Sequence, residues 1–356
     1  MTNLLKSAPL LLALTLLLEL HAVTGGEAQV QDASKPGVSV SYSLPTAQVS
    51  LHEPIVINFQ VDNETARVIG LDLGQDRKGE FVFTVTSPEG ATLHLPQYRH
   101  NGISQYGTVS VQPGESFSQS LLLNEWYDNF NVPGKYVLGA RLTKPIVTGE
   151  TPQLDSGFTG EIYITHRDPA RLEKVCADLA KQVETAPNPE AAQEPALMLS
   201  YIEDPIAVPY LARVLATKTL TYDKAIAGLK RIGNDAAVEE LLSALNKNGD
   251  IADAAAHALS QMLDKISDAR LKETVNKAVE RTTERERNEF IKTQIAYLEY
   301  RDPNLQHTAI QELVRVENGL KQAEPALQRL ADDPNQPSDV RAAAKDALQK
   351  LHPPPR

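Results

Sequence analysis

Histidine and cysteine are the side chains of this 356-residue chain that could most readily ligate a metal or act as a nucleophile. No two histidines lie three to five residues apart and none forms a His-Glu-x-x-His pair, so the spacing of a zinc site is absent. The eight histidines are His21, His52, His94, His100, His166, His257, His307 and His352. The sequence also has no Gly-rich phosphate loop before a helix and no Gly-x-Ser-x-Gly elbow, so we expect no metal, no cofactor and no enzymatic activity.

Cys176 is the single cysteine, so no disulfide can form within the chain. It lies in "RLEKVCADLAKQV" at helical spacing from Leu172 and Leu179. A thiol among such neighbours behaves as a small apolar side chain. We predict a buried Cys176 rather than a nucleophile.

Aromatic residues gather in two loops and could bind a partner. "NEWYDNF" holds Trp126, Tyr127 and Phe130, and "QYRHNGISQY" holds two further tyrosines. Aromatic rings with a polar tip suit protein or sugar recognition when they are exposed. Two interpretations stay open for Trp126: a residue that binds a partner together with Tyr127, or a residue that fills the end of a core.

The first half of the chain has a hydrophobic period of two, which is typical of strands. "PIVINFQV" places Ile55, Ile57, Phe59 and Val61 on one face, and turn formers such as "SPEG" and "VPGKY" separate similar runs. We predict seven to nine strands in an antiparallel β-sandwich over residues 38–167.

This half resembles the immunoglobulin-like sandwiches of exported bacterial proteins. The stretch from Val111 to Leu142, "VQPGESFSQSLLLNEWYDNFNVPGKYVLGARL", also resembles the intracellular proteinase inhibitor family in its turns and final strands. The aromatic loop around Trp126 leaves open an alternative function, in which the sandwich loops regulate or inhibit a hydrolase by blocking its cleft.

The second half has a helical period that begins with Asp168 as N-cap and Pro169 at the first helical position. A shift of 30 residues aligns apolar residues in four columns, which indicates a repeated pair of helices. In "IGNDAAV" Gly233 ends one helix and Asp235 caps the next. The columns are Leu199, Leu229 and Leu259; Ile202, Ile232 and Met262; Leu211, Leu241 and Leu271; and Leu215, Leu245 and Val275.

"EDPIAVPYLARVL" and "AIAGLKRIGNDAAVEELLSAL" resemble HEAT repeats of the short, phycobilisome-lyase-like type, and "DVRAAAKDALQKL" resembles the first helix of one more repeat. The resemblance implies an all-α solenoid over residues 168–352, in which the second helix of each pair lines the concave side. Two rows of exposed residues would then face a protein partner: Tyr210, Glu240 and Arg270, and Arg213, Ser243 and Glu273.

The mixed-charge run "RTTERERNEF", Arg281 to Phe290, is predicted to be the start of a solvated helix. It lies in the part of the helical half where the repeat spacing is irregular.

Export is indicated by the N-terminal residues. Lys6 precedes "APLLLALTLLL", an apolar run too short for a membrane span, and small residues follow it. We predict a signal peptide over 1–28, a linker over 29–37, a tail over 353–356, and a secreted or periplasmic bacterial protein that is not inserted in the membrane after cleavage. The formal net charge of −11 disfavours nucleic acid as a partner.

The sequence therefore predicts an exported, non-enzymatic protein that binds a protein partner through the helical half. It does not identify that partner.

Overall fold

The computed structural model describes residues 37–98, 106–148, 151–153, 157–217, 220–247 and 249–352. The predicted signal peptide, the linker up to residue 36 and the predicted tail lie outside these ranges. The chain divides into two compact units. One is rich in β-strands and comprises residues up to Val49 together with Ile55–Thr165, and the other is helical and comprises Ser50–Pro54 with the residues from His166 onward.

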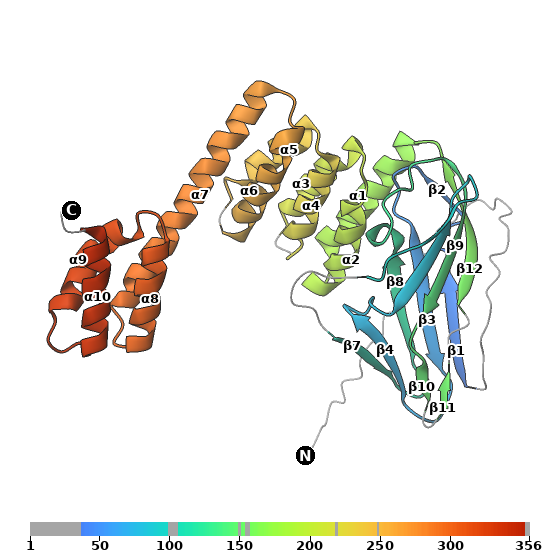
Figure 1. Ribbon diagram of the computed structural model, residues 1–356. Helices are drawn as coiled ribbons and strands as arrows, with labels where there is room; N and C mark the ends of the chain where they lie inside the picture. The colour runs from blue at the N-terminus through green and yellow to red at the C-terminus, as the bar shows by residue number, and fades with distance from the viewer. Residues whose placement is uncertain are drawn as a thin grey trace, which may run out of the picture. The chain divides into compact units, whose positions relative to one another are not determined.

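The β-rich unit contains antiparallel sheets of three, four and five strands (Figure 1). Their orders are β1-β3-β8, β11-β10-β4-β7 and β2-β12-β9-β5-β6. The strands are β1 (Val38–Ser43), β2 (Gln48–Ser50), β3 (Val56–Asn63), β4 (Ile69–Gln75), β5 (Phe81–Thr86), β6 (Thr92–His94), β7 (Tyr106–Val111), β8 (Ser116–Leu122), β9 (Gly134–Leu142), β10 (Ile146–Thr148), β11 (Thr151–Gln153) and β12 (Phe158–Thr165).

The alternation of apolar residues forms the core between these sheets. Ile57, Phe59 and Val61 of β3 are fully buried, as their spacing predicted. The ring of Phe59 meets that of Phe81 in the five-stranded sheet edge-to-face, with the centroids 5.0 Å apart. The described strands number twelve rather than seven to nine. Four of them have only three residues, too few to show a period in the sequence.

The helical unit begins as predicted. The Asp168 carboxylate accepts the N–H of Arg171 at 3.1 Å, and Pro169 opens the first helix. Its α-helices are α1 (Pro169–Thr185), α2 (Pro189–Ser200), α3 (Val208–Leu215), α4 (Tyr222–Ile232), α5 (Asp235–Ala244), α6 (Asp250–Met262), α7 (Ala269–Leu298), α8 (Pro303–Arg315), α9 (Gly319–Asp332) and α10 (Ser338–Leu351).

The turn between α4 and α5 corrects one detail of the prediction. Gly233 ends α4 with a left-handed φ of 64°, as expected. The N-cap of α5 is Asn234, whose side-chain oxygen accepts the N–H of Ala237 at 2.9 Å, so Asp235 is the first helical residue instead. Both residue types cap helices well, and the residue that directly follows the glycine has the extended backbone that a cap requires.

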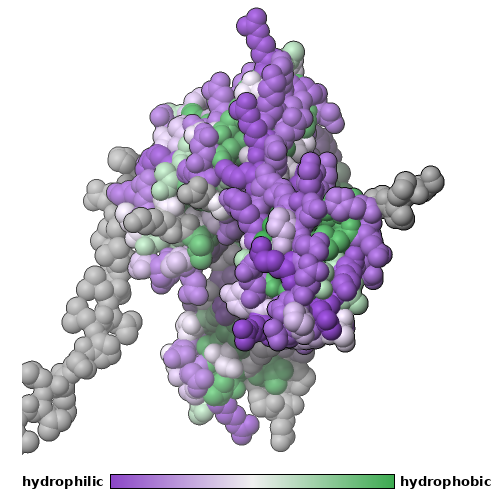
Figure 2. Space-filling view, turned by 90° about the vertical axis from the view of Figure 1, so that its left-hand side faces the viewer, coloured by the Kyte–Doolittle hydropathy of each residue, from purple (hydrophilic) through white to green (hydrophobic). Residues whose placement is uncertain are grey.

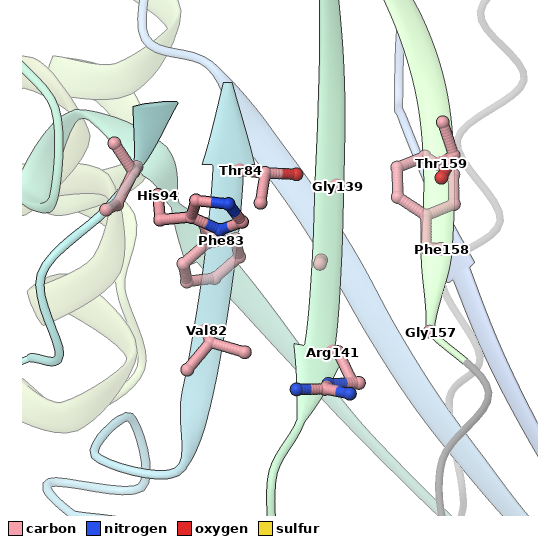
Figure 3. Close-up of a pocket in the computed structure, with 11 residues that line it drawn as sticks. Val82, Phe83, Thr84, His94, Gly139, Arg141, Gly157, Phe158 and Thr159 are labelled. Atoms are coloured by element: carbon pink, nitrogen blue, oxygen red, sulfur yellow. The ribbon is translucent and has the colours of Figure 1, made fainter. Parts of the chain in front are cut away.

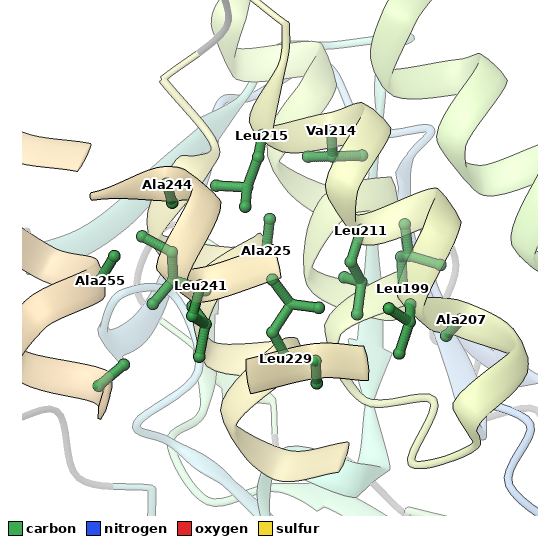
Figure 4. Packing of buried hydrophobic residues seen from close by; sticks show 14 of the residues in the cluster. Leu199, Ala207, Leu211, Val214, Leu215, Ala225, Leu229, Leu241, Ala244 and Ala255 are labelled. Atoms are coloured by element: carbon green, nitrogen blue, oxygen red, sulfur yellow. The ribbon is translucent and has the colours of Figure 1, made fainter. Parts of the chain in front are cut away.

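The repeated columns form one hydrophobic core shared by α1 to α6 and the start of α7 (Figure 4). Leu199, Leu229 and Leu259 are fully buried, as are Leu211 and Leu241. Helices α2, α4 and α6 pack side by side, while α3 packs against α4 and α5 against α6. The 30-residue spacing therefore identifies the residues that hold the helices together.

Helix α7 has 30 residues and corrects a second prediction. Arg281–Phe290 lies in the interior of this helix rather than at a helix start. Figure 1 shows α7 running from α5 and α6 at one end to α8 at the other. Ile291 and Leu298, near its C-terminal end, join a separate core with α8, α9 and α10.

The mixed charges of Arg281–Phe290 lie between the two cores. Thr282 is the one buried residue of this run, so polar side chains surround the middle of the helix. Within the described ranges no helix, not even α7, is long and apolar enough to cross a membrane.

Candidate functional site

Tyr210 and Arg213 of the predicted rows lie together on α3 and contact α1. The Arg213 guanidinium donates two hydrogen bonds to the Glu184 carboxylate, at 2.9 and 2.7 Å. It also lies 5.6 Å from the centre of the Tyr210 ring. Burial raises the pKa of Tyr210, and the carboxylate of Glu173 raises it further. These residues form one ordered group, which we call the α3 cluster: Glu173, Glu184, Tyr210 and Arg213.

The other predicted residues of the rows are not joined to this cluster. Ser243 on α5 is exposed, and so are Arg270 and Glu273 on α7, whereas Glu240 is half-buried. Glu273 forms an ion pair with Lys277 on its own helix, at 2.6 Å. Among the residues that the structure describes, no side-chain hydrogen bond or ion pair connects α3, α5 and α7 through these positions.

Trp126 lies in the core of the β-rich unit. Its side chain is only 8% exposed, and its ring centre is 4.6 Å from that of Phe83 and 5.4 Å from that of Tyr98. The indole Nε1 is buried without a hydrogen-bond partner in the described part of the chain. This position matches the interpretation of Trp126 as a residue that fills the core.

Tyr127 is half-buried, and its ring packs edge-to-face on Phe130 with the centroids 4.8 Å apart. A role for Trp126 and Tyr127 in binding a partner stays a prediction. Residues 99–105 of the second aromatic loop lie outside the described residues.

A hollow of about 510 Å³ lies on the five-stranded sheet (Figure 3), at residues that were not predicted to form a site. Strand register places His94, Thr84, Gly139 and Thr159 in one row across β6, β5, β9 and β12. Arg141 lies two residues along β9, opposite Val82. We call this region the sheet hollow. It is lined by Val82, Phe83, Thr84, His94, Leu95, Gly139, Ala140, Arg141, Gly157, Phe158 and Thr159.

Two glycines keep the sheet hollow open. A Cβ atom on Gly139 would collide with the hydroxyl of Thr84, which Figure 3 shows directed towards Gly139. Gly157 has a φ of 81°, a left-handed conformation that favours glycine, and a Cβ there would lie 3.4 Å from that of Arg141. One sequence signal was available. Gly139 stands at an outward position inside the strand "YVLGARL", and a glycine inside a strand often marks a site where a ligand or another backbone comes close.

A smaller hollow of about 260 Å³ lies between α8 and α10. Its lining includes Ile310, Val314 and Ala347 below a polar rim. Two of the rim side chains already have partners, since His307 lies 3.2 Å from Asp339 and Arg315 pairs with Glu312. Figure 2, which views the molecule from the left-hand side of Figure 1, shows a largely hydrophilic face with separate hydrophobic areas.

Comparison with known proteins does not assign the chain to a family. No family model matches the sequence, and no curated protein matches it. Among solved structures, a β-glucosidase from Listeria innocua in complex with gluconolactone is 14% identical, with a TM-score of 0.20. The match covers 40% of this chain and 17% of the glucosidase.

Two further solved structures are similarly distant. An engineered protein is 20% identical over 51% of this chain and 78% of its own, with a TM-score of 0.22. A β-glucosidase from Erythrobacter marinus is 18% identical over 36% of this chain and 16% of its own, with a TM-score of 0.20. The chain thus spans less than a fifth of the length of either glucosidase.

Proposed function

We propose that this chain is an exported, non-enzymatic protein that binds a protein partner through its helical unit. In this proposal residues 1–28 are a cleaved signal peptide that directs the chain to the periplasm or the medium. The β-rich unit is an immunoglobulin-like sandwich, and the helical unit is a HEAT-type solenoid. The buried 30-residue columns support the solenoid, because stacked helix pairs need such a shared core.

The α3 cluster is the observation that carries the proposal. Tyrosine and arginine are the residue types that contribute most to protein–protein affinity. Here Arg213 is exposed, yet the two hydrogen bonds that it donates to Glu184 already orient its guanidinium. A side chain that is ordered before binding loses less conformational entropy when a partner docks.

The chemistry of the surrounding surface favours a protein over a repetitive polymer. The residues along the rows are of different kinds, whereas a polymer with one repeating unit would call for a uniform row. The net charge of −11 argues against nucleic acid, which requires a basic face.

The test is affinity capture from envelope and culture fractions of the cells that make the protein, with the chain in the form that those cells produce. We expect one specific partner that Arg213→Ala weakens about 10-fold, because a hydrogen-bonded charge at an interface contributes one to three kcal/mol. Arg329→Ala is the matched control, since Arg329 also forms an exposed ion pair, with Glu299 at 2.6 Å. Equal loss in both variants, or no specific partner, contradicts the proposal.

The hydrolase-regulator alternative predicts a different dependence. Tyr127→Ala, and not Arg213→Ala, would then abolish capture, and the captured protein would be a hydrolase whose activity falls on binding. Mass spectrometry of the N-terminus of the recovered chain tests the signal peptide separately. A chain that retains residues 1–28 contradicts cleavage without bearing on the binding site.

A further inference from the structure

Over β5, β9 and β12 the sheet hollow can recognise a ligand through side chains, because each of these strands is paired on both sides. Strand β9 pairs with β5 on one side and with β12 on the other, so the backbone groups beneath the hollow are used within the sheet. An extended peptide gains most of its affinity from backbone bonds at a free sheet edge, and among the strands of the hollow only β6, at its margin, is an edge strand. The hollow therefore favours a compact ligand that carries its own hydrogen-bonding groups.

Four polar side chains border the hollow and are available for such a ligand. They are Thr84, His94, Arg141 and Thr159, and none has a hydrogen-bond or ion-pair partner among the described residues. His94, Arg141 and Thr159 are also exposed. Hydroxyl groups both donate and accept hydrogen bonds, and imidazole does so when neutral. The border thus offers paired donors and acceptors of the kind that bind a polyhydroxylated molecule.

The charge of the hollow selects for an anion. Arg141 carries a permanent positive charge, and no carboxylate is among the lining residues. Glu161 lies on the same face of β12 as Thr159, but its carboxylate pairs with Lys135 at 2.6 Å. The exposed guanidinium of Arg141 is free to bind a carboxylate of a ligand in a bidentate manner.

We propose that the sheet hollow binds an acidic sugar, with the sugar carboxylate on Arg141 and its hydroxyls on Thr84, Thr159 and His94. The volume of about 510 Å³ falls in the range of small-molecule sites. Gly139 and Gly157 provide the space, since a side chain at either position would enter the hollow or meet its walls. This site lies in the β-rich unit and is independent of the α3 cluster.

The test is calorimetric titration of the full chain with trigalacturonate and with neutral galactotriose. We expect the acidic trisaccharide to bind at least about 10-fold more tightly than the neutral one, and Arg141→Gln to remove that difference. Arg67→Gln is the control, because it deletes one exposed positive charge of the β-rich unit outside the hollow and frees no carboxylate beside it. Gly139→Ala should weaken binding at least about 10-fold by placing a methyl group against Thr84.

Several outcomes would overturn the proposal. These are equal affinity for the two sugars, an Arg141→Gln variant that binds like the wild type, and no binding up to about 10 mM. Tighter binding of triglutamate than of trigalacturonate would replace the sugar with an acidic peptide. If Gly139→Ala does not fold, the comparison of Arg141→Gln with Arg67→Gln still decides.

Discussion

Glu53 and Arg171 are 118 residues apart in the sequence, yet the carboxylate of Glu53 accepts a hydrogen bond from Nε of Arg171 at 2.8 Å. The same carboxylate accepts the N–H of Ser50, and the hydroxyl of Ser50 accepts the N–H of Asp168 at 2.8 Å. Glu53 is only 5% exposed. These bonds tie Ser50–Pro54, the last residue of β2 and the turn after it, to the start of α1, in keeping with its place in the helical unit.

Replacing Glu53 should therefore destabilise the helical unit. Glu53→Ala removes the buried carboxylate that accepts the N–H of Ser50 and the Nε–H of Arg171. We expect a loss of about 1–3 kcal/mol in the free energy of unfolding, measured by chemical denaturation followed by circular dichroism.

Glu161→Ala provides the comparison, because its bond to Lys135 joins two side chains that are more than half exposed. Such surface pairs contribute at most about 1 kcal/mol. Equal losses in the two variants would show that the Glu53 bonds do not hold Ser50–Pro54 in place.

The cores follow from the sequence because periodicity reports burial. The alternation in "PIVINFQV" and the columns through Leu199, Leu229 and Leu259 both identify residues that are at most 1% exposed. Leu271, in the first turn of α7, and Ile232, at the end of α4, are exceptions, since each is only half-buried against the first core. Local signals therefore predict the elements and most of their buried faces.

Contacts between residues that are far apart in the sequence could not be predicted from local patterns. The sheet hollow exists because register aligns Thr84, Gly139 and Thr159 from three strands, and a single sequence does not state that register. The bond between Glu53 and Arg171 likewise needs the folded chain. The continuity of α7 was missed because the repeat pattern suggested a new helix near Arg281.

Acid should weaken the contact between Asp204 and Arg167. The Arg167 guanidinium bonds to both carboxylate oxygens, one of them at 2.9 Å, and holds the pKa of Asp204 below its usual value. The unfolded chain therefore takes up a proton first as the pH falls. The stabilisation is complete above about pH 5 and is lost as the pH falls from about 4 through the lower folded-state pKa.

Asp204→Asn tests this dependence while keeping an oxygen that can cap the N–H of Ile206. The difference in unfolding free energy between wild type and variant should be largest at neutral pH and should shrink below about pH 4. Thermal unfolding from pH 7 to pH 2.5 measures it. A difference that does not change with pH would assign the effect to shape rather than charge.

Cys176 should be inert in the folded protein. Its side chain is fully buried on α1, and burial raises the pKa of the thiol to about 12, so almost no thiolate exists at pH 8. We expect no reaction with a thiol-specific disulfide reagent under native conditions and one equivalent after denaturation. Rapid native labelling would contradict the burial. Cys176→Ser should cost about 1–2 kcal/mol, because the variant buries a hydroxyl.

The continuity of α7 can be tested at Glu284, which is exposed and has no partner among the described residues. Proline is tolerated in the first turn of a helix but costs about 3 kcal/mol or more in its interior. If α7 runs unbroken over Ala269–Leu298, Glu284→Pro should lower the unfolding free energy by that amount. Glu284→Ala, which keeps the backbone N–H, should leave it nearly unchanged.

Amide hydrogen exchange would show where the proline acts. With a continuous α7, Glu284→Pro should reduce protection over the turn that precedes residue 284, because proline removes one hydrogen bond and clashes with the carbonyl four residues earlier. Leu229 and Leu241, in the core formed by α1 to α6, should stay protected. A proline variant as stable as Glu284→Ala would mean that a helix begins near Arg281, and the two cores would then be joined by a break in α7.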